Sequence, residues 1–402
     1  MKMLSRLLAA TVLCATAACG GSLPGSVSTG GSAPAGKPGG AIGHVFIIVL
    51  ENKSFGRAFG EDGASPYLSK VLPSMGLLMR EYYGTGHASL DNYITMVSGQ
   101  PPNVLTQADC PLFVDVLPGI PDPLAGHGVL IGQGCVYPKG TLTIADQLEA
   151  AHYSWKGYMQ DMGDDVDRDT TATCAHPKMN TADGTESAAV NDQYATRHNP
   201  FMYFHSIIDE QESCDRNVVN LRVLEQDLKS AATTPNYSFI TPDLCADGHD
   251  GSCADGGPGG FDGIDAFLRE WVPKITNSPA FQQDGFLLIT FDESDDNPDD
   301  GNDACCDEPT GPNTTAPGAA NINPDLTGLL TYAGGGRIGA VVVSPFVKPG
   351  SATDVPYNHY SMLRSVENMF GLEHLGYAGQ GGLAPFGEDV YNNGVIPTGT
   401  GS

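Results

Sequence analysis

The sequence predicts an α/β protein with a doubly wound, mostly parallel sheet flanked by helices. Strands buried on both faces are indicated by three continuous apolar runs rich in β-branched residues, at 44–50, 285–291 and 338–343. Helices are indicated at 143–151, 215–230 and 360–370. Because strands alternate with helices, this fold class is favoured over a helical bundle or a coiled coil. The 51 Gly and 29 Pro residues place much of the remaining chain in loops, above all at 100–140 and 292–335.

The first 40 residues differ in composition from the rest of the chain. Residues 1–18 combine Lys2 and Arg6 with an apolar run and a small-residue exit, which is the pattern of an export signal. Cys19 follows in a context that resembles a bacterial lipobox, and lipid attachment and plain cleavage both remain open. Residues 19–40 are rich in Gly, Ser and Pro and are typical of a flexible tether. We therefore expect a single domain over 41–402 in an exported protein, extracellular or in the cell envelope.

The charge balance excludes one large class of partner. The chain carries 20 Lys and Arg against 47 Asp and Glu, for a formal net charge of -27. No basic surplus is present to bind a phosphate backbone, so we expect no nucleic-acid partner. An anionic substrate would have to meet a local cation instead.

The cysteines beyond the leader predict disulfides. An even eight in an exported chain indicates a disulfide set, although the count alone does not decide the pairing. Cys110 with Cys135 and Cys245 with Cys253 are the pairs we expect from proximity in sequence. The adjacent Cys305 and Cys306 are expected to bond to different partners, because neighbouring residues close a strained ring.

Polar side chains follow two of the predicted strands directly. Glu51 and Asn52 come after the first run, and Asp292 and Glu293 come after the second. In open α/β sheets, ligands bind beyond the carboxyl ends of the strands, so these four side chains are expected to share one crevice. Their oxygen atoms suit a hard divalent cation. Each residue alone is better explained as a strand-end cap, but two such pairs together favour a metal site.

Ser89 precedes a predicted amphipathic helix that ends at Gly99. At a helix N-terminus, a serine can cap the helix or receive a phosphate beside the backbone N–H groups. Taken alone, the position favours the cap.

Six segments together resemble a known family. They are ENKSF at 51–55, HASLDNYITMVSG at 87–99, ITPDLCADGHDGSC at 240–253, LLITFDESDDN at 287–297, VVVSPFVKPG at 341–350 and YNHYSMLRSVENMFGL at 357–372. In this order they resemble the phosphoesterases of acid phosphatase and phospholipase C type within the alkaline phosphatase superfamily. The resemblance spans about 44–376 and implies an alkaline phosphatase-like fold.

The resemblance also implies roles for individual residues. Glu51, Asn52, Asp292 and Glu293 correspond to metal ligands, and Ser89 corresponds to a covalent nucleophile that also contacts the metal. Asn92, His249 and His359 complete the implied catalytic set. Asp243, Asp247, His249 and His359 are the candidates for a second metal site. Whether they form a complete site stays open, because the spacing of the acids from His249 differs from the spacing in the superfamily. The implied cofactor is a divalent metal ion, with Ca, Mg or Mn favoured over Zn by the oxygen-rich ligands.

The resemblance implies an exported metal-dependent phosphoesterase that hydrolyses phosphate monoesters through a phosphoserine intermediate. One alternative is a phosphodiesterase of phospholipase C type, since the same nucleophile and metal can cleave a diester. A second alternative is a binding lipoprotein without catalysis, against which Ser89 and the complete set of candidate ligands argue. The expected partner is a small phosphate ester or a phospholipid head group. Membrane contact is expected only through a lipid anchor at Cys19, and the protein is expected to be a monomer.

Two further features are interpreted as structural. His198, in the segment from Arg197 to Phe201, favours a structural role over a place in the pocket. The acidic segment 295–307 resembles a calcium loop, but Pro298 stands where that motif requires Asp or Asn, so a solvated loop is favoured.

Overall fold

A computed structural model describes residues 42–61, 63–295, 300–301, 303–314, 320–321, 330–331 and 334–393. The predicted export signal and tether lie outside these residues, as do parts of the acidic segment 295–307. The described residues belong to one compact unit, Gly40–Ser402. The boundaries at residues 18 and 40 therefore stay predictions.

An eight-stranded sheet forms the centre of this unit. In spatial order its strands are β15 (Ser351–Thr353), β2 (Leu77–Met79), β14 (Ala340–Val343), β11 (Gly285–Phe291), β1 (His44–Leu50), β10 (Tyr237–Thr241), β7 (Trp155–Met159) and β9 (Val218–Asn220). The pairings of β11 with β1, β1 with β10, β10 with β7, β7 with β9 and β15 with β2 are all parallel. The predicted α/β class with a mostly parallel sheet is confirmed.

The predicted strand at 338–343 differs from the expectation in direction. Strand β14 begins at Ala340 and runs antiparallel to both β11 and β2. The two other predicted strands, β1 and β11, lie side by side in the middle of the sheet, and every residue in them is buried. Burying a large aliphatic or aromatic side chain contributes roughly 1.5–3 kcal/mol, so this pair forms a stable platform for the residues that follow it.

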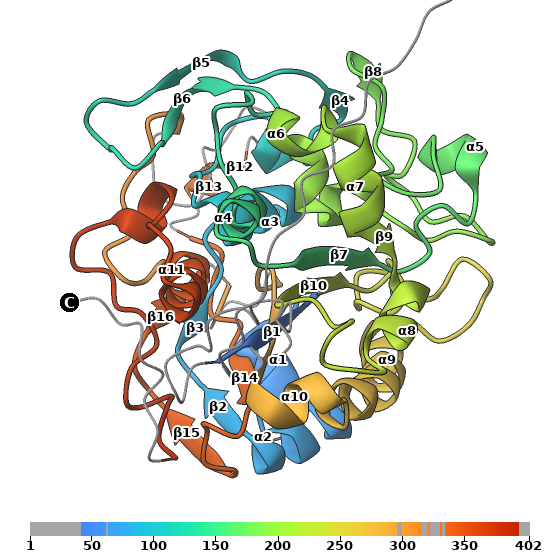
Figure 1. Ribbon diagram of the computed structural model, residues 1–402, viewed down its shortest axis with the longest axis vertical. Coiled ribbons are helices and arrows are strands. Elements are labelled where there is room, and N and C mark those ends of the chain that lie inside the picture. Colours follow the sequence, from blue (N-terminus) through green and yellow to red (C-terminus); the bar gives the residue numbers. More distant parts are fainter. Residues whose placement is uncertain are drawn as a thin grey trace, which may run out of the picture. The chain divides into compact units, whose positions relative to one another are not determined.

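Helices cover both faces of the sheet (Figure 1). On one side Figure 1 shows α3 (Ser89–Ser98), α4 (Ile144–Ala150), α6 (His205–Ile208), α7 (Gln211–Asn217) and α11 (His359–Phe370). On the other side lie α1 (Phe55–Phe59), α2 (Leu72–Met75), α9 (Gly260–Thr276) and α10 (Pro279–Asp284). The helices predicted at 143–151 and 360–370 are confirmed as α4 and α11. The first begins with a capping box, in which Thr143 and Asp146 bond to each other's backbone N–H groups.

The helix predicted over 215–230 is wrong as a continuous element. The chain there ends α7, forms the short strand β9, and then passes through a 3-10 turn at Leu221–Val223 into α8 (Leu224–Asp227). Val218 and Val219 are buried and pair with β7. This tertiary pairing of β-branched residues outweighs the local helical pattern.

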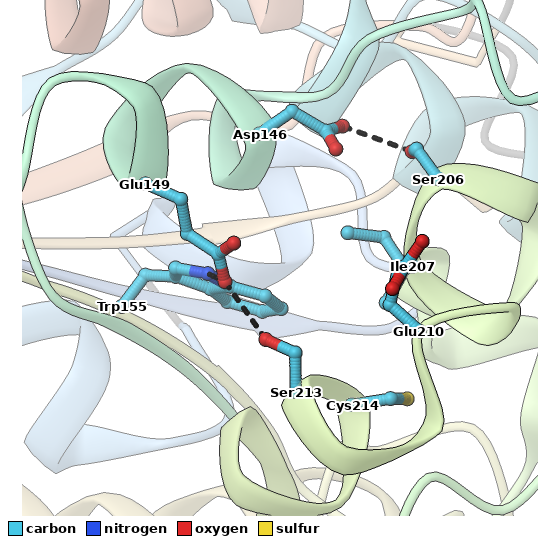
Figure 2. Close-up of a pocket in the computed structure, with 8 residues that line it drawn as sticks. All are labelled: Asp146, Glu149, Trp155, Ser206, Ile207, Glu210, Ser213 and Cys214. Atoms are coloured by element: carbon cyan, nitrogen blue, oxygen red, sulfur yellow. Dashed lines mark hydrogen bonds between the residues drawn. The ribbon is translucent and has the colours of Figure 1, made fainter.

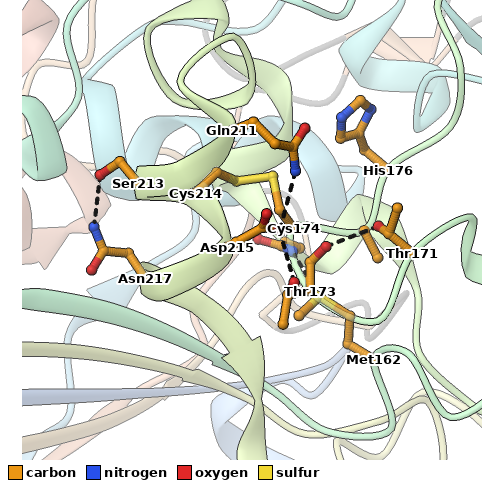
Figure 3. The surroundings of a disulfide bond; sticks show 12 residues. Met162, Thr171, Thr173, Cys174, His176, Gln211, Ser213, Cys214, Asp215 and Asn217 are labelled. Carbon is orange, nitrogen blue, oxygen red and sulfur yellow. Dashed lines mark hydrogen bonds between the residues drawn. A yellow bond between two sulfur atoms is a disulfide. The ribbon is translucent and has the colours of Figure 1, made fainter.

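Four disulfides connect the described loops and helices. The expected pairs Cys110–Cys135 and Cys245–Cys253 are both present. Cys174 bonds to Cys214, which ties the loop before β8 (Thr181–Ala182) to α7, and Figure 3 shows Thr173 and Gln211 donating hydrogen bonds to Asp215 beside it.

The expectation for the adjacent pair was wrong. Cys305 and Cys306 bond to each other, because the other six cysteines of this region are already paired among themselves.

Small two-stranded ribbons complete the described structure. They are β3 (Tyr82–Tyr83) with β16 (Tyr357–Asn358), β4 (Leu112–Phe113) with β8, β5 (Leu117–Pro121) with β6 (Leu130–Gln133), and β12 (Ala320–Asn321) with β13 (Leu330–Thr331), besides the short helix α5 (Val166–Asp169). Among the described helices, none combines the length and apolar character needed to cross a membrane.

Candidate active site

The candidate site lies at the carboxyl edge of the three central strands. Strands β11, β1 and β10 are parallel neighbours, so the segments after them emerge at the same edge of the sheet. Glu51 follows β1, Asp292 follows β11, and Asp247 lies in the loop after β10. Backbone hydrogen bonds connect these segments, because the Glu51 N–H donates to the Asp247 carbonyl and the Asp292 N–H donates to the Leu50 carbonyl, each at 2.9 Å.

Glu51 is the centre of the hydrogen-bond network. Its side chain is fully buried. Ser89 Oγ donates to Glu51 Oε2 at 2.9 Å, and the Tyr93 hydroxyl donates to Oε1 at 2.6 Å. Ser89 and Tyr93 stand four residues apart on α3, so both project from the same side of that helix.

The favoured capping role of Ser89 is therefore wrong. Ala88 occupies the N-cap position, and Ser89 begins the helix with its hydroxyl turned to Glu51. A backbone N–H in the first turn of the helix is also engaged, since Leu90 N–H donates to Asp109 Oδ1 at 2.9 Å. The helix predicted before Gly99 is present as α3, and all ten of its residues are buried.

His198 joins this group, although the sequence favoured a structural role for it. Its Nδ1 lies 3.1 Å from Asp247 Oδ2, and its Nε2 lies 3.5 Å from Glu51 Oε1. The imidazole stacks on the Tyr93 ring with centroids 5.4 Å apart. One ligand atom each from Glu51, His198 and Asp247 lie within 4.8 Å of one another. No sequence signal marked His198, because it stands in a short 3-10 helix far from any predicted strand end.

Burial determines the ionisation of these groups. It raises the pKa of Glu51 well above its ordinary value, and the carboxylates of Asp292 and Asp247 raise it further. Burial likewise raises the pKa of Asp247 and of Asp292. Burial lowers the pKa of His198 well below its ordinary value, and the charges of Arg197 and His249 add to the effect. A neutral imidazole among buried carboxylates is suited to bind a metal.

The arrangement fits a divalent cation. Three buried acids lie together. Glu51 and Asp247 contact His198, and within the described residues none of the three acids has an ion-pair contact with lysine or arginine. Lys53 is close, but its Nζ donates to the backbone carbonyls of Glu51 and Gly248 at 3.1 and 2.8 Å. Such uncompensated buried carboxylates are costly without a cation. A ligand set made only of oxygen atoms argues against zinc. Because His198 adds an imidazole nitrogen to this set, that argument no longer holds.

Two of the predicted metal ligands lie at the edge of this group. The Asn52 backbone N–H donates to Asp292 Oδ1 at 3.0 Å, and Asn52 has a left-handed backbone with φ of 54°. Glu293 Oε2 lies 2.7 Å from His87 Nδ1. Of the predicted metal ligands, Glu51 and Asp292 therefore interact directly within the buried group, and Ser89 contacts Glu51.

Asn92 holds the loop that precedes Ser89. Its Oδ1 accepts from the N–H groups of Thr85 and Gly86, and its Nδ2 donates to the carbonyls of Gly86 and Ala88. Both the oxygen and the nitrogen of the Asn92 side-chain amide are therefore engaged in hydrogen bonds. The geometry supports a positioning role for Asn92.

Two members of the predicted second site make other contacts. Asp243 Oδ1 accepts from the N–H groups of Cys245 and Ala246 and so caps a turn. His359, at the start of α11, has its Nε2 2.6 Å from the Asp292 carbonyl, and burial lowers its pKa to about 4. His359 thus supports the segment that carries Asp292.

His249 stands at the accessible side of the group. Its side chain is one-third exposed, with Nδ1 2.8 Å from Asp250 Oδ1. Its Nε2 lies 3.3 Å from the guanidinium of Arg197. Of the predicted second site, Asp247 contacts His198, and the His249 ring lies 5.9 Å from the His198 ring.

A separate acidic pocket of about 210 Å³ lies elsewhere, between α4, α6 and α7 (Figure 2). Its acids are occupied, since Asp146 accepts from Ser206 and caps α4, and Glu149 accepts from Trp155, Ser213 and Asn217. These hydrogen bonds give both acids a structural role.

Residues 62–373 match the Phosphoesterase family. The chain belongs to the Phosphoesterase family. The matched range includes Ser89, His198, Asp247 and Asp292, whereas Glu51 lies just before it.

This phosphoesterase-family chain is similar to several curated proteins. It is 23% identical to a probable acid phosphatase of Kluyveromyces lactis, over 84% of this chain and 60% of that protein. It is 26% identical to a phosphate-repressible acid phosphatase of Penicillium chrysogenum, over 82% and 59% respectively. It is 23% identical to a phosphatidylinositol-3-phosphatase of Mycobacterium tuberculosis, over 83% and 79%. The chain thus spans less than two thirds of the length of the fungal relatives.

Comparison with a solved protein of the alkaline phosphatase superfamily from Vibrio parahaemolyticus gives a TM-score of 0.46 at 12% identity, covering 83% of this chain and 67% of that chain.

Proposed function

We propose that this protein is an exported, metal-dependent phosphoesterase that hydrolyses phosphate monoesters through a phosphoserine formed on Ser89. The observation that carries the proposal is the contact of the Ser89 hydroxyl with buried Glu51, beside Asp292, Asp247 and His198. The similarity to proteins named acid phosphatases supports monoesters as substrates. Four disulfides support export, because such bonds persist in oxidising compartments.

Glu51, Asp292, Asp247 and His198 would hold the cation, with Asn52 and Glu293 beside them. A bound divalent cation supplies positive charge that favours a serine alkoxide and neutralises phosphoryl oxygens. Ser89 Oγ, with its proton released to solvent, attacks phosphorus in line with the leaving oxygen, forming one P–O bond as the ester P–O bond breaks. His249 is placed to donate a proton to the leaving alkoxide, since it is partly exposed at the edge of the group. Water then cleaves the Ser89–phosphorus bond and releases phosphate.

The alternatives keep specific support. The same residues can attack a diester, so a phosphodiesterase of phospholipase C type stays open, and a phosphatidylinositol-3-phosphatase among the relatives extends the substrate class to a phospholipid head group. Lipid attachment at Cys19 and a monomeric state belong to the proposal as sequence predictions. A binding lipoprotein without catalysis is the remaining alternative.

Hydrolysis of p-nitrophenyl phosphate and bis-p-nitrophenyl phosphate tests the proposal, with metal removed by EDTA and restored by Mg²⁺, Mn²⁺, Ca²⁺ or Zn²⁺. Activity is expected to disappear with EDTA and to return with one of these ions. Ser89→Ala is expected to lower kcat for the monoester by at least about 10³-fold, because the nucleophile is removed.

Ser98→Ala is the matched control. Ser98 is a buried serine of the same helix whose hydroxyl donates to the Ile94 carbonyl, at the end remote from Glu51. It is expected to retain turnover. Full activity of Ser89→Ala would refute the covalent mechanism, and inertness of the metal-loaded wild type towards both esters would favour the binding protein.

A further inference from the structure

Tyr93 is a fully buried tyrosine that contacts two residues of the candidate metal site in different ways. Its hydroxyl donates to Glu51 Oε1 at 2.6 Å. Its ring lies almost parallel to the imidazole of His198, with 9° between the planes and 5.4 Å between the centroids. Glu51 follows β1, whereas His198 stands in a 3-10 helix. One side chain of α3 therefore connects two ligand candidates that are remote in sequence.

The hydroxyl limits how the Glu51 carboxylate can rotate. Tyr93 donates to Oε1, and Ser89, one turn earlier on the same helix, donates to Oε2 at 2.9 Å. Two donors on one buried helix therefore hold the carboxylate plane in one orientation. If the phenol hydroxyl is removed, Oε1 loses its donor on α3, and the carboxylate can turn about its last side-chain bond. Hydrogen bonds of this kind keep metal ligands in their binding geometry.

The ring determines which nitrogen of His198 faces the site. Nδ1 lies 3.1 Å from Asp247 Oδ2, and Nε2 lies 3.5 Å from Glu51 Oε1. Within the described residues, Nε2 is buried and makes no hydrogen bond, so it is available as a ligand atom. An imidazole that turned about its Cβ–Cγ bond would collide with the stacked ring of Tyr93, because the two rings are closely packed. The stack thus keeps Nε2 turned towards Glu51.

Tyr93 is itself held by the core of the protein. Its ring packs edge-to-face against Phe239 of β10, with 6.2 Å between the centroids. Phe239 in turn packs edge-to-face against Phe201 at 5.7 Å. These contacts fix the position of the phenol ring independently of Glu51 and His198.

Another buried tyrosine donates to a carboxylate in different surroundings. The Tyr158 hydroxyl donates to Asp227 Oδ2 at 2.7 Å, and Lys156 contacts the same oxygen at 2.7 Å. A lysine therefore neutralises that carboxylate. Glu51 has no ion pair with lysine or arginine among the described residues. The carboxylate that Tyr93 orients thus has room in its environment for a cation.

We propose that Tyr93 is a positioning residue of the metal site, whose hydroxyl orients the Glu51 carboxylate and whose ring orients the His198 imidazole towards the same divalent cation. The hydroxyl acts on every divalent ion, since each of them accepts a carboxylate oxygen. The ring acts most on ions that favour imidazole nitrogen, such as Zn²⁺, and less on oxygen-preferring ions such as Mn²⁺. This inference rests on the proposed function for the presence of the cation and adds a residue that determines its affinity and identity.

The test compares Tyr93→Phe, which keeps the ring and removes the hydroxyl, with Tyr93→Leu, which removes both. The full-length protein is freed of metal with EDTA, and its affinities for Zn²⁺ and Mn²⁺ are measured by calorimetric titration, which requires no turnover. Tyr93→Phe is expected to weaken the binding of both ions about 10- to 100-fold, as when other residues that orient a metal ligand are changed. Tyr93→Leu is expected to weaken Zn²⁺ binding at least about tenfold more than Mn²⁺ binding, because the imidazole loses its stacked neighbour.

Tyr158→Phe is the matched control, because it also removes a buried phenol hydroxyl from a carboxylate. Asp227 lies outside the candidate site, and Lys156 still neutralises it after the substitution. The control is expected to lower the melting temperature of the metal-free protein and to leave both metal affinities unchanged. A role of Tyr93 in core packing alone predicts the same result for Tyr93→Phe.

The outcomes separate the positioning role from the proposed function. Unchanged affinities in Tyr93→Phe would overturn the inference, even where Tyr93→Leu fails to fold. Equal losses for Zn²⁺ and Mn²⁺ in Tyr93→Leu would overturn the part that concerns the ring. A wild type that binds neither ion would overturn the inference together with the metal site. A wild type that binds metal but hydrolyses neither p-nitrophenyl ester would refute the proposed function, whereas weaker metal binding by Tyr93→Phe would still support the positioning role.

Discussion

At the scale of single residues, one carboxylate organises the site. Glu51 accepts hydrogen bonds from Ser89 and Tyr93 and lies 3.5 Å from His198. Three segments remote in sequence therefore meet at one side chain. The family resemblance placed Asp243 in a candidate second metal site, but its hydrogen bonds are to the backbone of its own turn.

The raised pKa of Asp243 predicts how the stability of the protein depends on pH. Burial, with the charge of Asp161 added, raises its pKa from 3.8 to about 7 in the folded protein. The folded protein thus keeps this proton up to about pH 7, whereas the unfolded chain loses it near 3.8. The stability due to Asp243 is full below about pH 4 and is lost as the pH rises to about 7. Asp243→Asn keeps the acceptor oxygen and is expected to raise the free energy of unfolding at pH 8 by on the order of 3 kcal/mol.

Urea unfolding of metal-free protein between pH 4 and 8 measures this effect. Asp265→Asn is the control of opposite sign, because hydrogen bonds from Ser65, Arg269 and the Tyr67 N–H, acting against burial, lower the pKa of Asp265. It is expected to lower stability at neutral pH. A loss of turnover of more than about tenfold in Asp243→Asn would instead indicate that Asp243 belongs to the metal site.

At the scale of elements, α3 sets the position of Ser89. The helix is buried along its whole length and ends at Gly99, whose φ of 66° is left-handed. The Gly99 N–H donates to the Thr95 carbonyl, and the Tyr377 N–H donates to the Gly99 carbonyl. The end of the helix is thereby held against the C-terminal region.

Gly99→Ala is expected to destabilise the protein by more than about 2 kcal/mol. A Cβ at this position would meet the Leu375 carbonyl oxygen at 2.3 Å, in addition to the strain of positive φ. Gly126→Ala is the matched control, because Gly126 has a φ of 69° and open space around its Cα. Gly126→Ala is expected to lower the free energy of unfolding by about 1 kcal/mol. Thermal unfolding of the two variants compares them, and equal losses would contradict the steric part of the argument.

At the scale of the whole molecule, disulfides connect the loops around the sheet. Cys174 and Cys214 are 40 residues apart, whereas Cys245 and Cys253 are separated by 8. A cross-link that closes a longer loop removes more entropy from the unfolded chain. The longer bridge is therefore expected to contribute more to stability.

Replacing both Cys174 and Cys214 by Ala is expected to lower the free energy of unfolding by about 4 kcal/mol, against about 2.5 kcal/mol for Cys245 and Cys253. Urea denaturation of each double variant gives both values, with the wild type in dithiothreitol as the fully reduced reference. A larger loss from the shorter bridge would show that native contacts outweigh loop entropy here.

The sequence alone determined the fold class, the two central strands and the acids that follow them. Continuous apolar runs such as 44–50 and 285–291 are local signals, and a residue directly after a parallel strand must emerge at the carboxyl edge. Tertiary structure alone decided the place of His198, the break in the helix predicted over 215–230, the direction of β14 and the bond between Cys305 and Cys306. The first three depend on which remote segment packs alongside, and the local pattern of side chains carries no information about that neighbour. The bond between the two adjacent cysteines depends instead on how the other described cysteines pair across the fold.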